Sequence, residues 1–391
     1  MSTVSAWQAG LREPPLSCDV AVVGAGIAGA SAAYWLSQLR PALRVVLLDA
    51  ERPAAGASGR NAGFVLQGAG SDYALDIDRY GASAARRLWN LTRENRDLIA
   101  SDLGGTAAGF EATGSLVAAG DADEDARLRR AVALMRADGL PAAYLPARAL
   151  AERTLSRGFF GGLYTTTGGV VHPARLVARI VAASGADVRP NHRAASVERL
   201  TDGRLRVGTS ARDVVADAVV LALNAYAPRV VPALAAWVRP VRAQMLATAP
   251  GGPRELSPPV DSHEGYYYLR QLDDGSVLVG GARHRHAAAE IGYEDATTAA
   301  LQADLEGYLA HHFPSMASAP VARRWSGTMG FSPDGLPVVG AVPGLPGAVA
   351  ACGFTGHGMA YGVRVGRMLA EMALGNARPA DADLFAPERL R

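Results

Sequence analysis

Glycines and one acidic residue near the N-terminus have the spacing of a phosphate-binding turn. The chain reads Gly24-Ala25-Gly26-Ile27-Ala28-Gly29, and Asp49 follows 20 residues after Gly29. Gly24 allows a tight turn, Gly26 lets a diphosphate approach the backbone because it has no Cβ, and Gly29 lets a helix pack against a strand. A helix start offers free N–H groups to phosphate, and a carboxylate such as Asp49 accepts hydrogen bonds from a ribose. This pattern predicts a dinucleotide site.

The segments on either side of this turn have the composition that such a site requires. Asp19–Val23 and Leu43–Asp49 are apolar runs typical of buried parallel strands, and the Ala-rich run that ends at Leu39 is typical of a helix. A strand, turn, helix and strand in this order make the glycine motif far more specific than its glycines alone. The alternative is a glycine-rich helix start with no ligand.

A second glycine-rich segment, Gly56–Gly63, follows the acidic residue closely. Its small residues, with Ser58, Arg60 and Asn61, predict a loop at the carboxyl edge of the sheet, where cofactors bind in such folds. The loop suits a close approach of backbone to phosphate. The alternative is a flexible surface loop.

A third glycine-rich segment lies near the C-terminus. Ala348–Cys352 predicts a buried strand, and Gly353–Ala360 then leads into the final helix, which we expect to end near Leu374. The N–H groups at this second strand-to-helix junction could face another electron-rich part of the ligand. A further apolar strand, 216–223, ends at the polar tip Asn224–Tyr226, which we expect close to the dinucleotide.

The remaining segments predict two interleaved domains. We expect helices at 74–103, 121–138, 174–183 and 296–312, a strand at 110–119, a hairpin from 265 to 281, and a loop entering a strand at 325–340. The predicted fold is α/β. A Rossmann-like domain with a parallel sheet (1–80, 145–230 and 320–391) is interleaved with a mainly antiparallel α+β substrate domain (81–144 and 231–319).

The first strand of the hairpin carries side chains that could bind a substrate. Tyr266, Tyr268 and Arg270 share one face of this strand, and Tyr267 takes the other. An aromatic face can hold an amine by cation–π contact, whereas the alternative is tyrosines packed in a core. His172, which precedes Pro173, either faces the cofactor or only starts a helix.

The composition limits the classes of function. The 391 residues are 49% hydrophobic and carry a net charge of +2, which excludes wholesale disorder and gives no electrostatic case for nucleic acid. The chain has no lysine, so no lysine can act as base or nucleophile. Two distant cysteines, Cys18 and Cys352, fit a reducing compartment. The first 17 residues do not resemble a secretory signal, and no apolar run is long enough to span a membrane. We therefore expect a soluble cytoplasmic protein.

Taken together, these segments resemble the FAD-dependent D-amino acid oxidase / glycine oxidase / sarcosine oxidase superfamily, and most of all its γ-glutamylputrescine oxidoreductase-like branch. The resemblance covers nearly the whole chain and rests on 24–49, 56–63, 224–226, 325–340 and 353–360, which occur in family order. It implies hydride transfer from a C–H next to nitrogen onto flavin N5, with an amine or amino acid as substrate and O2 or another electron acceptor. It also implies no metal and a monomer or homodimer.

The resemblance assigns roles to individual residues. The implied contacts to FAD are Gly24, Gly26, Ile27, Ala28, Gly29, Asp49 and Ala50 at the ADP half, Gly56, Ala57, Ser58, Arg60, Asn61, Ala62 and Gly63 along the diphosphate and isoalloxazine, Ala194 at the adenine, and Asn224, Gly327, Gly353, Thr355, Gly356, His357, Gly358 and Met359 around the flavin. The candidate catalytic residues are His357, Tyr266, Tyr268, Arg270 and Met329. His357 could polarise the substrate, act as a base, or only anchor its loop.

The chain departs from the family pattern at three points. Relatives that bind a carboxylate often have an arginine where this chain has Met329, which disfavours a simple amino acid as substrate unless Arg242, Arg270 or Arg283 replaces that arginine. The lysine that sarcosine-oxidase-like members use for oxygen is absent, which leaves oxidase and dehydrogenase both open. Positions used elsewhere for covalent attachment hold Gly327 and Arg60, so we expect non-covalent FAD.

Three other functions are weighed against amine oxidation. One is oxidation of a 2-hydroxy acid or polyol on the same fold, and another is a non-catalytic flavin-binding scaffold. A nicotinamide-dependent dehydrogenase is disfavoured because it leaves the glycine-rich segment near the C-terminus unexplained.

Overall fold

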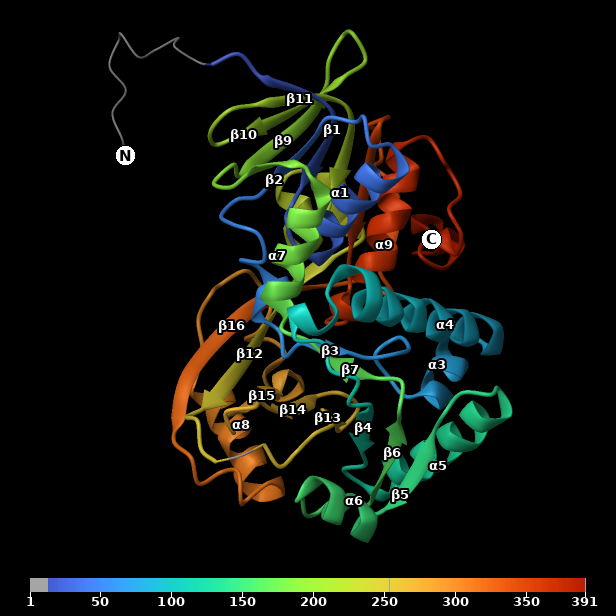
Figure 1. Ribbon diagram of the computed structural model, residues 1–391, viewed down its shortest axis with the longest axis vertical. Coiled ribbons are helices and arrows are strands. Elements are labelled where there is room, and N and C mark those ends of the chain that lie inside the picture. The colour runs from blue at the N-terminus through green and yellow to red at the C-terminus, as the bar shows by residue number, and fades with distance from the viewer. Residues whose placement is uncertain (1–12, 253, 391) are drawn as a thin grey trace.

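The computed structural model describes residues 13–390 except residue 253, so most of the segment tested above for a secretory signal lies outside the described residues. Two large sheets make up the molecule (Figure 1). The first, with its helices, fills the upper half of the view, and the second fills the lower half. The short strands β3 (Phe64–Val65) and β7 (Gly169–Val170) pair between them. No helix among the described residues has both the length and the apolar composition needed to cross a bilayer.

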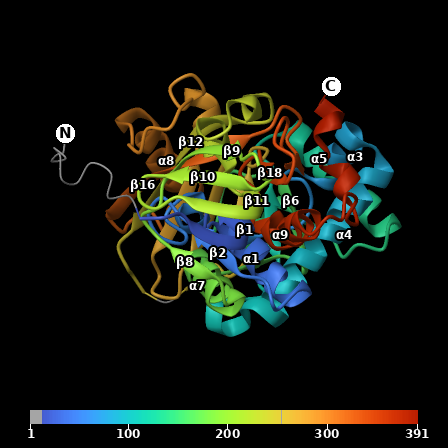
Figure 2. The same cartoon turned by 90° about the horizontal axis from the view of Figure 1, so that it is seen from above.

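The first sheet is built around parallel strands. In order, its strands are β17 (Val338–Ala341), β18 (Ala348–Cys352), β11 (Val214–Leu221), β1 (Leu16–Val23), β2 (Val45–Leu48) and β8 (Asp187–Arg189). All are parallel except β17. The antiparallel strands β10 (Leu205–Thr209) and β9 (Ala194–Arg199) continue from the first half of β11, as the view from above shows (Figure 2). This is the Rossmann-like sheet that the sequence predicts.

Helices α1 (Ile27–Leu39), α7 (Pro173–Ser184) and α9 (Gly358–Ala373) pack together beside this sheet (Figure 1). Two glycines of α9 allow a very close approach to α1. A Cβ at Gly362 would lie 2.6 Å from the Ile27 side chain, and one at Gly366 would lie 2.4 Å from that of Ser31. The two glycine-rich helix starts are therefore brought side by side, although more than 300 residues separate them in the sequence.

The second sheet is antiparallel apart from one pair. In order, its strands are β16 (Val321–Phe331), β12 (Arg239–Thr248), β15 (Val277–Gly281), β14 (Tyr267–Gln271), β13 (Val260–Ser262), β4 (Ser115–Ala118), β6 (Gly161–Thr165) and β5 (Ala143–Pro146), with β13 and β4 parallel. Helix α8 (Ala299–His312) packs against one face, where Tyr308 stacks on Tyr267 with ring centroids 4.3 Å apart. The other face is left for a ligand.

Four helices lie around the second sheet and around the boundary between the two sheets (Figure 1): α3 (Tyr73–Tyr80), α4 (Ala82–Leu98), α5 (Ala122–Ala137) and α6 (Ala147–Thr154). The predicted single helix over 74–103 is wrong, because Gly81 adopts φ 83 between α3 and α4 and turns the chain. The predicted strand over 110–119 shortens to β4. The expected loop at 325–340 is also wrong in its first half, because residues 325–331 continue β16 and pair with β12 at seven positions.

The remaining expected elements are present. The helices predicted at 121–138, 174–183 and 296–312 correspond to α5, α7 and α8, and the hairpin is β14 with β15. Strands β6 and β16 both belong to the second sheet, β6 beside β4 and β16 beside β12. The predicted division of the chain, however, places 145–230 and 320–391 in the first domain. The division into domains stays a prediction.

Candidate active site

The early glycine-rich turn joins β1 to α1 in the way that its residue types require. Gly24 has φ 101, and a Cβ there would lie 2.6 Å from the carbonyl oxygen of Ala222. A Cβ on Gly29 would lie only 1.8 Å from the carbonyl oxygen of Gly24, so the helix can pack this closely only with glycine. Gly26 is the N-cap of α1 and gives it no side-chain cap. The backbone at the start of α1, at Gly26 and Ala28, therefore lies open to the cavity.

Asp49 comes directly after β2, beside this turn. Its carboxylate accepts a hydrogen bond from the Ala25 N–H at 2.8 Å and another from the Glu51 N–H at 2.9 Å, one on each oxygen. Burial raises the pKa of Asp49, an effect that these two backbone bonds oppose. Each oxygen keeps a lone pair for a further donor, as binding of a ribose requires.

The second glycine-rich segment forms the short helix α2 (Ala57–Arg60). The Ser58 hydroxyl accepts a hydrogen bond from the Ile27 N–H at 2.9 Å, so this loop is fastened to the start of α1. Asn61 ends the helix by donating to the carbonyl oxygens of Ala57 and Ser58 and accepting from the Gly63 N–H at 2.7 Å. The loop is held in place rather than free on the surface.

Arg60 connects this loop to the second sheet. Its guanidinium lies 2.7 Å from the Asp295 carboxylate and donates to the Ser326 carbonyl oxygen at 3.0 Å. The Trp325 indole N–H donates to the Arg60 carbonyl oxygen at 2.9 Å. Gly327 of β16 faces the Arg60 side chain. A Cβ on Gly327 would lie 3.3 Å from the Cβ of Arg60, which explains why the strand carries glycine here.

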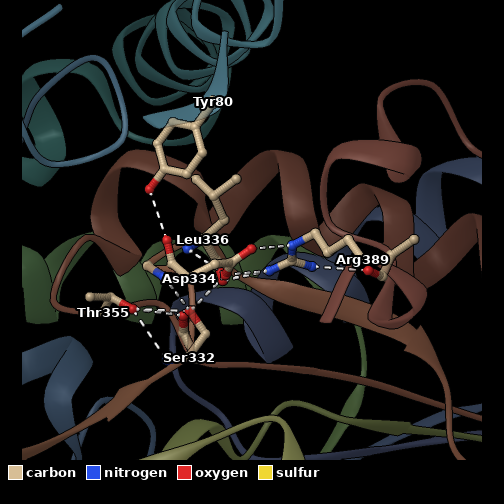
Figure 3. Close-up of polar contacts among 9 residues, drawn as sticks. Tyr80, Ser332, Asp334, Leu336, Thr355 and Arg389 are labelled. Atoms are coloured by element: carbon tan, nitrogen blue, oxygen red, sulfur yellow. Dashed lines mark hydrogen bonds and ion pairs between the residues drawn. The ribbon is translucent and has the colours of Figure 1, made fainter. Parts of the chain in front are cut away.

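The late turn, between β18 and α9, is held by two other segments of the chain. The Asn224 side-chain oxygen accepts from the Gly353 N–H at 3.0 Å, and the Thr355 N–H donates to the Gly330 carbonyl oxygen at 2.8 Å. The Thr355 hydroxyl lies within hydrogen-bonding distance of Ser332, in the network of Figure 3. The same network joins Asp334 to Arg389 at 2.7 Å. The turn is thereby fixed against β11 and the end of β16.

A single cavity of about 810 Å³ connects the three turns to the open face of the second sheet. Most of the residues predicted to bind the cofactor line it: Gly24, Gly26, Ile27, Ala28, Asp49, Ala50, Gly56, Ala57, Ser58, Arg60, Asn61, Ala62, Ala194, Asn224, Gly327, Thr355, Gly356, His357, Gly358 and Met359. Of the predicted catalytic residues, Tyr268, Met329 and His357 line it as well.

Five predicted site residues are not on the cavity wall: Gly29, Gly63, Gly353, Tyr266 and Arg270. The three glycines shape the backbone of the turns. The Arg270 guanidinium donates to the carbonyl oxygens of Ala62 and Val171 at 3.0 and 2.8 Å, so it supports the second loop from behind. The Tyr266 ring packs on His284, with centroids 4.4 Å apart. The prediction that Tyr266 and Arg270 reach the substrate from the same face as Tyr268 has no support in this arrangement.

The three arginines that could replace the missing arginine at Met329 have different surroundings. Arg242 is buried in an ion pair with Glu290 at 2.8 Å, and Arg270 is held by carbonyl oxygens. Arg283 alone of the three lines the cavity. Its guanidinium lies between the rings of Tyr266 and Phe331, at 5.0 and 5.3 Å from their centroids.

Arg283 has no ion-pair or hydrogen-bond partner for its side chain within the part of the chain that the structure describes. Burial lowers its pKa, and only tyrosines oppose this effect. A guanidinium keeps its charge even so, because its ordinary pKa is far above neutrality. A half-buried cation on a cavity wall, with no carboxylate beside it among the described residues, can bind an anionic group of a ligand.

His357 lies at the start of α9, against the backbone of Gly70. A Cβ on Gly70 would lie 1.9 Å from the Nε2 atom of His357. Burial, together with the positive charge of Arg283, lowers the pKa of His357 to about 4. The ring is therefore neutral at physiological pH. It can accept or donate one hydrogen bond inside the cavity, but it adds no positive charge there.

The structure distinguishes the two interpretations of His172, a residue that faces the cofactor or one that only starts a helix. It is the N-cap of α7, where its ring nitrogen accepts a hydrogen bond from the Arg175 N–H at 3.3 Å, and it does not line the cavity. Cys352 is buried in β18, and burial raises the pKa of its thiol to about 12.

Several cavity residues were missed by the sequence interpretation, among them Asp261, Tyr293 and Asp295. Asp261 lies on β13, a three-residue strand too short to produce an alternating pattern. Asp295 and Tyr293 lie between elements, and only the contacts of Arg60 and Ala225 reveal their position. The sequence contains no local signal for them.

Comparison with known proteins gives the class. Residues 19–372 match the family described as FAD dependent oxidoreductase, and the chain belongs to this family. The chain is 27% identical over 376 residues to a probable oxidoreductase, OrdL, of Rhizobium meliloti, covering 93% of this chain and 84% of the relative. It is 27% identical over 384 residues to γ-glutamylputrescine oxidoreductase of Escherichia coli, covering 94% of this chain and 86% of that relative.

The fold is also that of a solved structure. The crystal structure of glycine oxidase from Geobacillus kaustophilus superposes with a TM-score of 0.81 at 22% identity, covering 95% of this chain and 98% of that one. These matches confirm the resemblance seen in the sequence, the α/β fold class and FAD as the cofactor.

The three turns fit FAD on their own geometry. The start of α1 lines the cavity at Gly26 and Ala28, beside glycines that leave no room for a Cβ, which suits a diphosphate. The Asp49 oxygens suit a ribose. We expect the start of α9, with Gly356–Met359, to meet the flavin. When bound, FAD supplies the acceptor for two electrons and a proton, which the protein's own side chains lack.

Proposed function

We propose that this FAD-dependent oxidoreductase oxidises the C–N bond of a small amine or amino acid, and that the substrate carries an acidic group. The observation that carries this proposal is Arg283, a half-buried cation without a carboxylate partner among the described residues, on the wall of the cavity that the FAD-binding turns share. An acidic group of the substrate supplies the missing partner. The two similar relatives named above include an oxidoreductase of a γ-glutamyl amine, which supports this substrate class.

The residues around Arg283 suit this chemistry. Tyr268 lines the cavity next to it, and burial raises the pKa of the Tyr268 hydroxyl to about 12, so the phenol stays neutral. The substrate loses a hydride from the carbon next to nitrogen and a proton from the nitrogen, which leaves an imine that water can hydrolyse. A positive charge near the reacting amine favours its uncharged form, and an uncharged amine is the form that can give up the hydride.

We also propose the finer properties that the sequence predicts. The FAD is bound non-covalently, the electrons pass to O2 or to another acceptor, and the protein works in the cytoplasm as a monomer or homodimer. We propose a division of the chain in which β6 and β16 belong to the substrate domain, since both pair in the second sheet.

The test is anaerobic reduction of the bound flavin. Purified holoenzyme is mixed without oxygen with primary amines, secondary amines, amino acids and 2-hydroxy acids, and bleaching of the flavin absorbance is followed. We expect bleaching by amines that carry a carboxylate. Bleaching by 2-hydroxy acids alone would contradict the proposal, and so would a flavin that no compound bleaches. Readmitting air then distinguishes an oxidase from a dehydrogenase.

A further inference from the structure

Asp261 is a carboxylate on the cavity wall that the proposed chemistry does not use. It lies on β13 and lines the cavity. Its side chain has no hydrogen-bond or ion-pair partner among residues 13–390, leaving out residue 253. Burial alone raises the pKa of Asp261 to about 7, and no nearby charged group contributes to this shift. An unpartnered carboxylate in such a place is costly unless a cation binds to it.

The register of the second sheet shows what lies beside Asp261. Asp261 is paired with Tyr268 on β14, and Tyr268 is paired with Gly280 on β15. Paired residues of neighbouring strands project to the same face, so Asp261 and Tyr268 share the face that lines the cavity. The Tyr268 ring covers Gly280, where a Cβ would lie 2.3 Å from the ring. Arg283 is the second residue after the end of β15.

Arg283 and Asp261 therefore flank Tyr268 on opposite sides. Their Coulomb effects on the Tyr268 hydroxyl have opposite signs: Arg283 lowers its pKa and Asp261 raises it. Neighbouring strands are about 4.8 Å apart, so β15 and β13 are separated by roughly 10 Å. That distance suits a small molecule that lies across Tyr268 with an anionic group at one end and a cationic group at the other.

Arg283, and not Asp261, is the charged residue that acts on the late turn, because its positive charge contributes to lowering the pKa of His357. The FAD-binding turns meet the second sheet at β16, where Arg60 contacts Gly327, and at β14, where Arg270 donates to the Ala62 carbonyl oxygen. Strand β13 is four positions from β16 in the sheet, beyond β12, β15 and β14. A substrate whose acidic group is held by Arg283 keeps its neighbouring amine at the late turn, which leaves Asp261 for a second nitrogen.

We propose that Asp261 is a specificity-determining residue that binds a second, positively charged nitrogen of the substrate. The substrate class is then an amine with a carboxylate and a distal ammonium group, such as a basic amino acid. This inference rests on the proposed function, because it assumes that the cavity beside the flavin receives an amine. It adds which amine is preferred.

The test compares two amino acids of matched chain length, ornithine and norvaline, which differ by the distal nitrogen, in both enantiomers. Affinity is measured by calorimetry on holoenzyme whose flavin has been reduced with dithionite, so that no oxidation takes place. We expect the native protein to prefer ornithine by about tenfold or more, the usual effect of a charged hydrogen bond. We expect Asp261→Asn to reduce this preference to within about twofold.

Asp273→Asn serves as the matched control, because Asp273 lies in the turn of the β14–β15 hairpin with a side chain that is 87% exposed, outside the cavity. It should keep the preference for ornithine. The proposal is overturned if the native protein shows no preference, if the preference survives Asp261→Asn, or if that variant weakens both amino acids equally. The proposed function fails separately, in the experiment where no amine bleaches the native flavin.

Discussion

The two ends of the cavity are built in different ways. At the dinucleotide end, the ligand is met mainly by backbone N–H groups and by glycines that no other residue can replace, as at Gly24 and Gly29. At the substrate end, it is met by side chains of separate strands, as at Tyr268 and Asp261. Backbone contacts recognise a group that every member of the family binds, whereas side chains can be exchanged without disturbing the sheet. This difference separates the conserved chemistry of a flavoenzyme from its choice of substrate.

The largest expected effect comes from the dinucleotide end. Gly29→Ala places a methyl group on the carbonyl oxygen of Gly24, so α1 must move away from the sheet. We expect at least a tenfold loss of bound flavin per protein, because a backbone shift at this point removes several contacts together. The measurement is the ratio of flavin to protein absorbance, with circular dichroism to follow folding. The control is Gly307→Ala in α8, where a Cβ meets nothing within 4 Å. A fully flavinated Gly29→Ala protein would remove the contrast between the two ends.

Asp49→Asn is expected to have a smaller effect at the same end. The charge that accepts the ribose hydrogen bonds is lost, while the side chain keeps its shape. The dissociation constant for FAD should rise about 10- to 100-fold, with little change in the turnover of enzyme saturated with FAD. Titration of apoprotein with FAD, followed by fluorescence, gives this constant. An unchanged affinity would show that the carboxylate does not contact the ribose.

At the substrate end, Arg283→Gln should act on the substrate rather than on the cofactor. We expect KM for carboxylate-bearing amines to rise about 10- to 100-fold, because the anionic group loses its charged partner. The FAD content should stay the same. Steady-state kinetics with one carboxylate-bearing amine and one amine without an acidic group make the comparison. Equal losses with both substrates would mean that Arg283 supports the cavity but does not bind the acid.

The smallest expected effect is on stability, at Asp261. Its pKa in the folded protein, about 7, lies above its ordinary value. The folded state therefore binds more protons than the unfolded state between about pH 4 and 7, and stability falls as the pH rises through that range. In Asp261→Asn this pH dependence disappears, so Tm relative to the native protein should increase by a few degrees between about pH 4 and 8. Thermal unfolding at the two pH values measures it, and a parallel pair of curves would contradict it.

The same difference explains what the sequence could predict. The residues of the early turn are adjacent in the chain, so the spacing from Gly24 to Asp49 and the surrounding apolar runs were sufficient to predict the strands, the helix and most of this part of the cavity wall. Gly353–Met359 could be recognised for the same reason. The substrate end depends on which strands pair and in which register. Alternation along 266–270 gave the correct face for Tyr268 but could not reveal that Arg270 turns back to carry the second loop, or that β13 lies next to it.

Strand β16 is an edge strand of the second sheet, and its C-terminal end also holds the late turn. It pairs with β12 along its length, forms a bridge from Phe331 to Phe354, and accepts the Thr355 N–H at Gly330. A hinge motion that separated the two sheets would have to break these bonds, close to the late turn where we propose that the flavin binds. These contacts therefore favour a constant distance between the late turn and the side chains of β16 while the enzyme turns over.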